Sequence, residues 1–193
     1  MRLDILNHGY GPATKLLFKI IRLFSGHPVP DAAKLVFYRS DFYGTQAKTF
    51  THEAMRGPSA WSVADRELMA AFVSQINECA FCSSAHTATA AQAYQNSAKV
   101  HAVLTDLESA PIDNGLRTTL RMLAKLTRDA KVDAEDVREA LSAGVSPRQV
   151  EDALAVCFAF NTTARLADAF AFELLSPDDF EAGARYLLKR GYR

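Results

Sequence analysis

The 193-residue sequence predicts an all-α protein. Apolar residues recur every three or four positions almost throughout the chain, as they do along one face of a helix. Helix-start signals such as Ser62-Val63-Ala64-Asp65 and Ser176-Pro177-Asp178 precede apolar runs. No segment shows the alternation expected of a strand. We therefore expect helices in nearly every part of the chain.

The first helices are expected before residue 58. Apolar residues of the first one share a face that Gly26 ends, namely Leu16, Leu17, Ile20, Ile21 and Phe24. This basic amphipathic helix, Lys15–Phe24, is expected to pack against the domain or a neighbouring subunit rather than a membrane. Two more helices are expected at Pro30–Tyr38 and Ala47–Arg56, separated by a looser segment at Asp41–Gly44.

The remaining helices follow the capping signal at Ser62. An apolar stripe from Leu68 to Ile76 predicts one helix, and Asn77 predicts a break before a second helix that reaches Tyr94. The later helices are expected at Ser97–Leu107, Asn114–Arg128, Ala134–Ser142 and Pro147–Leu175, with a last one from Ser176 to Gly191.

Length and composition favour one compact unit, with residues 1–57 as an N-terminal helical extension and residues 58–193 as the main helical domain. The 22 basic and 22 acidic residues balance, which indicates no general attraction to nucleic acid or to anionic membranes. A neutral chain also meets little barrier to self-association, so we expect a homo-oligomer. The sequence shows no membrane span or export signal, which predicts a cytoplasmic protein.

A weak internal repeat appears when the chain is shifted by 84 residues. Ser62 then falls on Ser146, Glu67 on Glu151, and Asn77 on Asn161. Two similar helical halves are one interpretation, and the chance recurrence of helix-start signals is the other. Thr163 and Leu166 stand in the second copy where the first copy has cysteines.

Four residues that can hold or transfer protons lie within 20 positions: Glu67, Cys79, Cys82 and His86. On a helix, Cys79 and Cys82 lie about one turn apart on one face, and His86 follows one turn later. If the chain bends at Asn77, Cys79 begins a new helix, where unpaired N–H groups lower the pKa of a thiol. Glu67 is expected to have a thiol or an imidazole as its partner, because a buried carboxylate is costly alone.

Other interpretations of these residues stay open. The cysteines could be core residues, or the four side chains could bind zinc, although no second pair of ligands is evident. Cys157 lies in an apolar run and is expected to be an inert core thiol. Arg165 and Asp168 are expected to form an ion pair.

The spacing from Glu67 through Cys79 and Cys82 to His86 resembles the signature of the alkylhydroperoxidase D-like (AhpD-like) group in the carboxymuconolactone decarboxylase superfamily. The likeness is strongest from Ser62 to Tyr94 and weaker over Leu116–Phe172.

The resemblance implies an AhpD-like helical fold, trimers or hexamers, and a peroxidase activity on hydroperoxides. It implies that Cys82 attacks and becomes a sulfenic acid, that Cys79 resolves it, and that Glu67 and His86 relay protons. A thiol or dihydrolipoyl reductant would then reopen the disulfide, and no cofactor or metal is implied.

One position departs from the best-known members of the group, since Phe81 stands where they have a second histidine. A thiol–disulfide oxidoreductase, a carboxymuconolactone decarboxylase-like enzyme and a non-catalytic zinc-binding oligomer are the alternatives.

Overall fold

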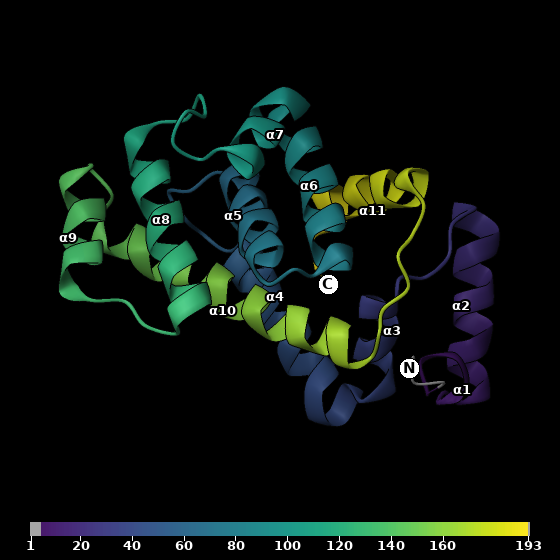
Figure 1. Cartoon of the computed structure of the whole chain (residues 1–193). Coiled ribbons are helices and arrows are strands. Elements are labelled where there is room, and N and C mark those ends of the chain that lie inside the picture. Colours follow the sequence, from purple (N-terminus) through teal and green to yellow (C-terminus); the bar gives the residue numbers. More distant parts are fainter. Residues whose placement is uncertain (1–4, 193) are drawn as a thin grey trace.

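The computed structural model describes residues 5–192, and within that range the chain is helical without a strand (Figure 1). The predicted all-α fold is therefore confirmed. The elements are α1 (Ile5–His8), α2 (Pro12–Ser25), α3 (Asp31–Tyr38), the π-helical turn η1 (Ser40–Gly44), α4 (Thr45–Arg56), α5 (Val63–Ile76), α6 (Ala80–Tyr94), α7 (Ser97–Thr105), α8 (Asn114–Asp129), α9 (Ala134–Ser142), α10 (Pro147–Ala169) and α11 (Pro177–Arg190).

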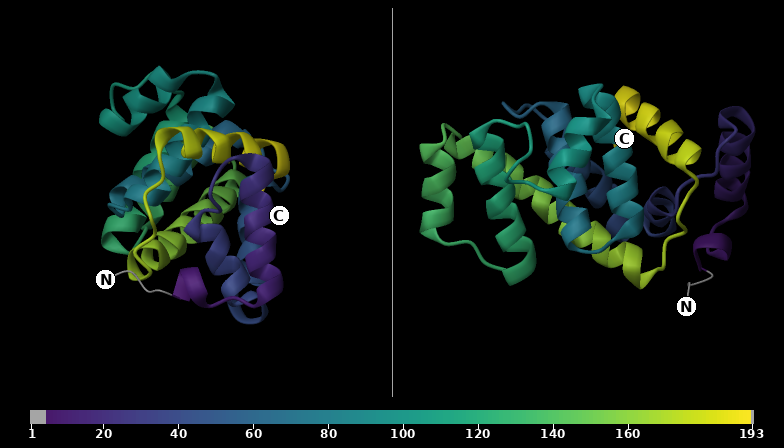
Figure 2. Two further views of the ribbon diagram at one scale, coloured as in Figure 1. Left: turned by 90° about the vertical axis from the view of Figure 1, so that its right-hand side faces the viewer. Right: turned by 45° about the horizontal axis from the view of Figure 1, so that its top comes forward.

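Helix α5 is the centre of the molecule and packs against α6, α8 and α10. The long α10 packs against α5, α4 and α8 and runs from α9 at one end of the molecule towards α3 (Figures 1 and 2). Helix α11 returns along α6. This return brings the last residues of the chain back to the middle of the bundle.

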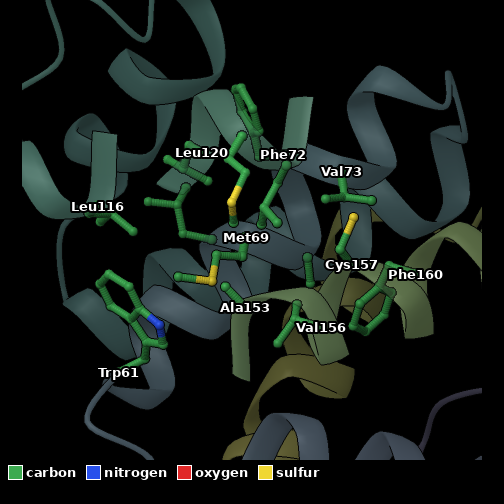
Figure 3. Close-up of a cluster of buried hydrophobic side chains, with 14 of the residues drawn as sticks. Trp61, Met69, Phe72, Val73, Leu116, Leu120, Ala153, Val156, Cys157 and Phe160 are labelled. Atoms are coloured by element: carbon green, nitrogen blue, oxygen red, sulfur yellow. The ribbon is translucent and has the colours of Figure 1, made fainter. Parts of the chain in front are cut away.

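The main core lies where the apolar faces of α5, α8 and α10 meet. Met69 and Leu120 are fully buried there, and Val156 packs with them (Figure 3). Burial of each such side chain contributes roughly 1.5–3 kcal/mol. The indole Nε1 of Trp61 donates to the carbonyl of Gln149 at 2.8 Å, which ties the start of α5 to the start of α10.

The predicted break at Asn77 is confirmed. Helix α5 ends in a Schellman turn, in which Glu78 has φ +56°. The amide of Glu78 donates to the carbonyl of Gln75, and that of Cys79 donates to the carbonyl of Ser74. Cys79 then serves as the N-cap of α6, so the turn that closes one helix places a thiol at the start of the next.

Helix α10 ends at Ala169, six residues before the predicted end at Leu175. A second Schellman turn stops it, with Ala171 at φ +47° and the amide of Phe172 bonded to the carbonyl of Ala167. Glycine is the usual signal for this turn, and here its place is taken by alanine. Residues 171–176 therefore form a linker instead of helix.

The predicted ion pair between Arg165 and Asp168 is wrong. Arg165 donates instead to the side-chain oxygen of Asn77 at 3.4 Å and to the carbonyl of Asn161 at 3.2 Å. Asn77 also donates to Asn161 Oδ1 at 3.1 Å, which joins two residues 84 positions apart. Helices α5 and α10 begin 84 positions apart as well, each in a capping box, as the interpretation of two similar halves requires.

The N-terminal helix α2 buries none of its residues and stands at the edge of the molecule (Figure 2). It contacts the rest of the chain through Phe18, whose ring meets those of Tyr10 and Phe37 edge to face.

The proposed division at residue 57 stays a prediction; Ala54 and Met55 belong to the main core. From residue 5 to residue 192, the helices lack the combined length and apolar character that a membrane crossing requires.

Candidate active site

Cys79 and Cys82 are free thiols at the start of α6, and they lie close enough for each to shift the pKa of the other. Both are almost completely buried, with exposed fractions of 1% and 2%. The redox disulfide implied by the resemblance is not formed in the structure.

The two thiols differ in protonation. The hydrogen bond from the Cys82 thiol lowers the pKa of Cys79 to about 7; burial opposes this shift, and the amides of Cys82 and Phe81 at the start of α6 support it. The same contact and burial raise the pKa of Cys82 well above its ordinary value. Asp168 opposes ionisation of both thiols. Cys79 is therefore the more acidic of the two thiols.

An apolar cover shields the thiol pair. Phe81 meets Phe172 of the linker and Phe180 of α11 edge to face, with ring centroids 5.3 and 5.7 Å apart. Ala164 and Ala167 of α10 complete the same cluster. Phe81, which replaces the histidine expected from the best-known AhpD-like members, is therefore part of this cover.

Glu67 and His86 form the second half of the site. Glu67 Oε2 lies 2.8 Å from His86 Nδ1, which confirms the prediction that the carboxylate has an imidazole partner. An ionised carboxylate only accepts, so Nδ1 carries the proton and donates it. The ring of Phe160 packs edge to face against the imidazole of His86, with the two ring centroids 4.2 Å apart.

Arg56 and Tyr192 were not anticipated from the sequence, yet both bind Glu67. Arg56 Nη2 donates to Glu67 Oε1 at 2.6 Å, and the Tyr192 hydroxyl lies 3.0 and 3.2 Å from the two oxygens. These residues lie 11 positions before and 125 positions after Glu67, and no spacing rule connects them. The only sequence signal for such partners was that a buried carboxylate such as Glu67 requires a nearby cation.

Burial raises the pKa of Glu67, but the hydrogen bond and charge of His86, together with Arg56, outweigh it and lower the pKa overall. Burial and the nearby Glu67 charge raise the pKa of Tyr192, so its hydroxyl stays protonated and donates. The carboxylate is thus held in its charged form.

The four predicted residues are therefore brought together as two pairs. In the part of the chain that the structure describes, no hydrogen bond joins either sulfur to Glu67 or His86. The link between the pairs is helix α6, on which His86 lies one turn beyond Cys82. Burial raises the pKa of Tyr43 in η1; a hydrogen bond with Thr163 opposes this shift, and the nearby Cys82 adds to it.

The site has no group of three or more metal-ligating side chains, and none occurs elsewhere between residues 5 and 192. The third cysteine, Cys157, is fully buried in the main core, where Asn161 Nδ2 donates to its sulfur at 3.1 Å. Burial raises the pKa of this thiol. A buried protonated thiol is a poor nucleophile, in contrast to Cys79.

Comparison with known proteins relates this site to a family. The model of the carboxymuconolactone decarboxylase family matches residues 44–125, which include Glu67, Cys79, Cys82 and His86. None of the curated proteins matches the chain.

Solved structures share the fold over nearly the whole chain. An uncharacterized peroxidase-related protein from Silicibacter sp. TM1040 is 27% identical with a TM-score of 0.77, and the match covers 90% of this chain and 92% of the other. A second peroxidase-related protein, with an alkylhydroperoxidase AhpD core, comes from Ralstonia eutropha JMP134; it is 18% identical with a TM-score of 0.72, covering 91% and 90%. The debrominase Bmp8, solved as a variant with 2,3,4-tribromopyrrole, is 14% identical with a TM-score of 0.70, covering 92% and 90%.

Proposed function

The chain is a relative of the carboxymuconolactone decarboxylase family with an AhpD-like fold, and we propose that it is a thiol-dependent peroxidase that reduces hydroperoxides with Cys79 and Cys82. The observation that carries the proposal is the position of two free cysteines at the start of α6, where the contact with Cys82 lowers the pKa of Cys79 to about 7. One sulfur is thereby activated as a nucleophile while its neighbour is ready to resolve the product.

The first step forms a sulfur–oxygen bond. The thiolate attacks the terminal oxygen of the hydroperoxide, the O–O bond breaks, and the alkoxide takes up a proton to leave as an alcohol. The sulfur is oxidised to a sulfenic acid, and the peroxide is reduced by two electrons.

The second step closes the disulfide. The other thiol loses its proton and attacks the sulfenic sulfur, which releases water. His86, one turn along α6, is the base for this proton, directly or through one water. An external reductant then reduces the disulfide, and we propose that it is a thiol or a dihydrolipoyl-type dithiol.

The protonation of the pair favours Cys79 as the attacking sulfur and Cys82 as the resolving one. This order is the reverse of the one that the family resemblance implies. The assignment is decided by which serine variant accumulates a sulfenic acid. A Cys82→Ser variant that retains the acid supports Cys79 as the attacker, and a Cys79→Ser variant that retains it supports Cys82.

The peroxidase proposal is tested by mixing the reduced protein with cumene hydroperoxide and counting thiols after denaturation. We expect two of the three thiols to disappear within minutes and Cys157 to remain. A Cys79→Ser/Cys82→Ser double variant is the matched control and should consume no peroxide. If all three thiols of the wild-type protein persist, the peroxidase proposal fails.

Two other activities have separate signatures. A thiol–disulfide oxidoreductase would exchange with a disulfide substrate faster than with peroxide. A reaction that does not use sulfur, such as that of a decarboxylase-like enzyme, would survive in the double serine variant. Stoichiometric zinc by elemental analysis would instead favour the non-catalytic oligomer.

A further inference from the structure

We infer that Arg56 and Tyr192 are positioning residues, which hold Glu67 as a fixed negative charge so that His86 keeps Nδ1–H on Glu67 and exchanges protons through Nε2. The inference rests on the proposed function and deepens it. It differs from a relay in which Glu67 itself takes up and releases the proton.

The first argument is the number of donors around the carboxylate. Glu67 is fully buried, and three side chains donate to its two oxygens: Arg56 to Oε1, His86 to Oε2, and Tyr192 to both. Protonating one oxygen would break at least one of these contacts and leave a donor buried without an acceptor. Such a loss is costly, so the carboxylate stays ionised through the reaction.

The second argument is charge. The ion pair of Arg56 with Glu67 is almost wholly buried, at exposed fractions of 10% and 0% for the two side chains. Arg56 therefore already balances the carboxylate, and His86 is needed beside it only as a hydrogen-bond donor through Nδ1–H. A neutral imidazole with Nδ1–H engaged leaves Nε2 as the atom with a free lone pair.

The third argument is the backbone turn at Gly191, which places the Tyr192 ring beside Arg56. Gly191 follows α11 with φ +68°, and a Cβ there would lie 2.7 Å from the His52 ring. The amide of Tyr192 donates to His52 Nδ1 at 3.3 Å. This turn directs the Tyr192 ring under the Arg56 guanidinium, 5.1 Å from the ring centroid.

Arg56 also fastens α11 itself. Its Nη2 lies 3.2 Å from the carbonyl of Leu187 and its Nη1 donates to the carbonyl of Met55 at 2.8 Å. One guanidinium thus joins α4, α5 and α11 at the point where the imidazole from α6 arrives. The orientation of His86 therefore depends on how the last turn of the chain is seated.

The charged and titratable groups around the pair come from each packed element. Arg56 and His52 belong to α4, Arg66 to α5, and Tyr192 follows α11. Helix α10 contributes the uncharged ring of Phe160 and, beside Arg66, the carboxylate of Asp152. These groups are therefore the ones that determine how the pH dependence of the reaction responds to a change at Tyr192.

The test uses Tyr192→Phe, which removes one hydroxyl and keeps the ring. Tyr186→Phe is the matched control, since Tyr186 lies on α11 and is 57% exposed. The rate of thiol loss with cumene hydroperoxide is measured from pH 5 to pH 9 in all three proteins. The Nδ1–H proton of His86 is followed by NMR, with assignment from its loss in His86→Gln.

We expect Tyr192→Phe to react about 10-fold more slowly, as the loss of one hydrogen bond to a charged group implies. The pH profile of the rate should change, because the Glu67 carboxylate then has one donor fewer to hold it beside the imidazole. The Nδ1–H resonance should shift, and Tyr186→Phe should match the wild-type protein in every measurement.

Two failures are distinguishable. If Tyr192→Phe keeps the wild-type pH profile and resonance, the positioning inference is overturned while the peroxidase proposal stands. If the wild-type protein does not react with peroxide, the peroxidase proposal fails, and the resonance alone decides whether Tyr192 positions His86. A shift confined to Tyr192→Phe supports the inference in either case.

Discussion

At the scale of single residues, the chemistry depends on where Cys79 lies rather than on which residues flank it. Cys79 is at once the third residue after α5 and the N-cap of α6. It therefore meets amide groups of a new helix and the thiol of Cys82 in the same place. A thiol in the middle of a helix would not lie near unpaired amide groups, because these occur in the first turn of a helix.

This environment predicts the pH dependence of Cys79. The pKa of about 7 means that the thiolate is present above pH 7 and is lost as the pH falls below it. The rate of alkylation of Cys79 by iodoacetamide, followed by mass spectrometry of its peptide, should rise with a midpoint near pH 7. In Cys82→Ala, the thiol donor is gone and the midpoint should move about one unit upward or more. An unchanged midpoint would contradict this effect of Cys82 on Cys79.

The buried carboxylate of Glu67 predicts a large effect on stability. Arg56→Met leaves its charge without a cation, and we expect the free energy of unfolding in urea at pH 7 to fall by about 3–5 kcal/mol. Adding Glu67→Gln to Arg56→Met should recover a large part of this loss. A double variant as unstable as the single one would show that Arg56 acts by packing alone.

The sign of the pH effect follows from the lowered pKa of Glu67. A carboxyl that is more acidic in the folded state stabilises it above the unfolded pKa, about 4.3, and this contribution is lost as the pH falls through the folded pKa. The wild-type protein should therefore lose stability in acid. Arg56→Met should lose less, because protonation relieves its uncompensated charge.

At the scale of elements, two Schellman turns arrange the site. The turn at Asn77 opens α6 at Cys79, and the turn at Phe170 stops α10 so that residues 171–176 can cross over the thiols. Both turns place a residue other than glycine at positive φ, Glu78 and Ala171. The linker is held in part by Asp31, whose Oδ2 accepts from the amide of Glu173 at 2.8 Å.

The linker predicts access to the thiols. Phe172→Ala removes the ring that covers Phe81, so local opening should be easier and the rate of alkylation of Cys79 should increase roughly 10-fold. Leu174→Ala is the control, since Leu174 lies in the same linker and is 58% exposed. Equal rates in both variants would mean that substrates reach the thiols from another side.

At the scale of the whole molecule, α2 leaves a continuous apolar face uncovered. Leu23 and Phe24 are the most exposed residues of this face, at 79% and 85%. Contiguous exposed apolar surface is typical of an interface between proteins. The homo-oligomer expected from the sequence stays a prediction, and α2 offers an exposed apolar face for it.

Light scattering tests this prediction. We expect a mass that is a multiple of the 21.2 kDa chain, and a lower mass for Leu23→Lys/Phe24→Lys at the same concentration. Tyr186→Lys, on the exposed face of α11, is the control and should leave the mass unchanged. A wild-type protein of 21.2 kDa would contradict the expected assembly.

Local signals in the sequence were sufficient for the helical class, for most helix positions and for the break at Asn77. Capping residues and apolar spacing act over a few positions, and those interactions can be read from neighbours in the chain. The proximity of the two cysteines was likewise expected from their helical spacing. The partnership of Glu67 with His86 was expected because a buried carboxylate needs a donor.

Contacts between distant segments were decided only by the tertiary structure. Tyr192 reaches Glu67 because α11 folds back along α6, and Arg56 reaches it because α4 packs against α5. Arg165 turns to Asn77 instead of Asp168 because α5 ends beside α10. The early end of α10 depends on a left-handed alanine that local propensity disfavours. In each case the free energy comes from packing partners far away in the chain, and a pattern of neighbouring residues does not contain them.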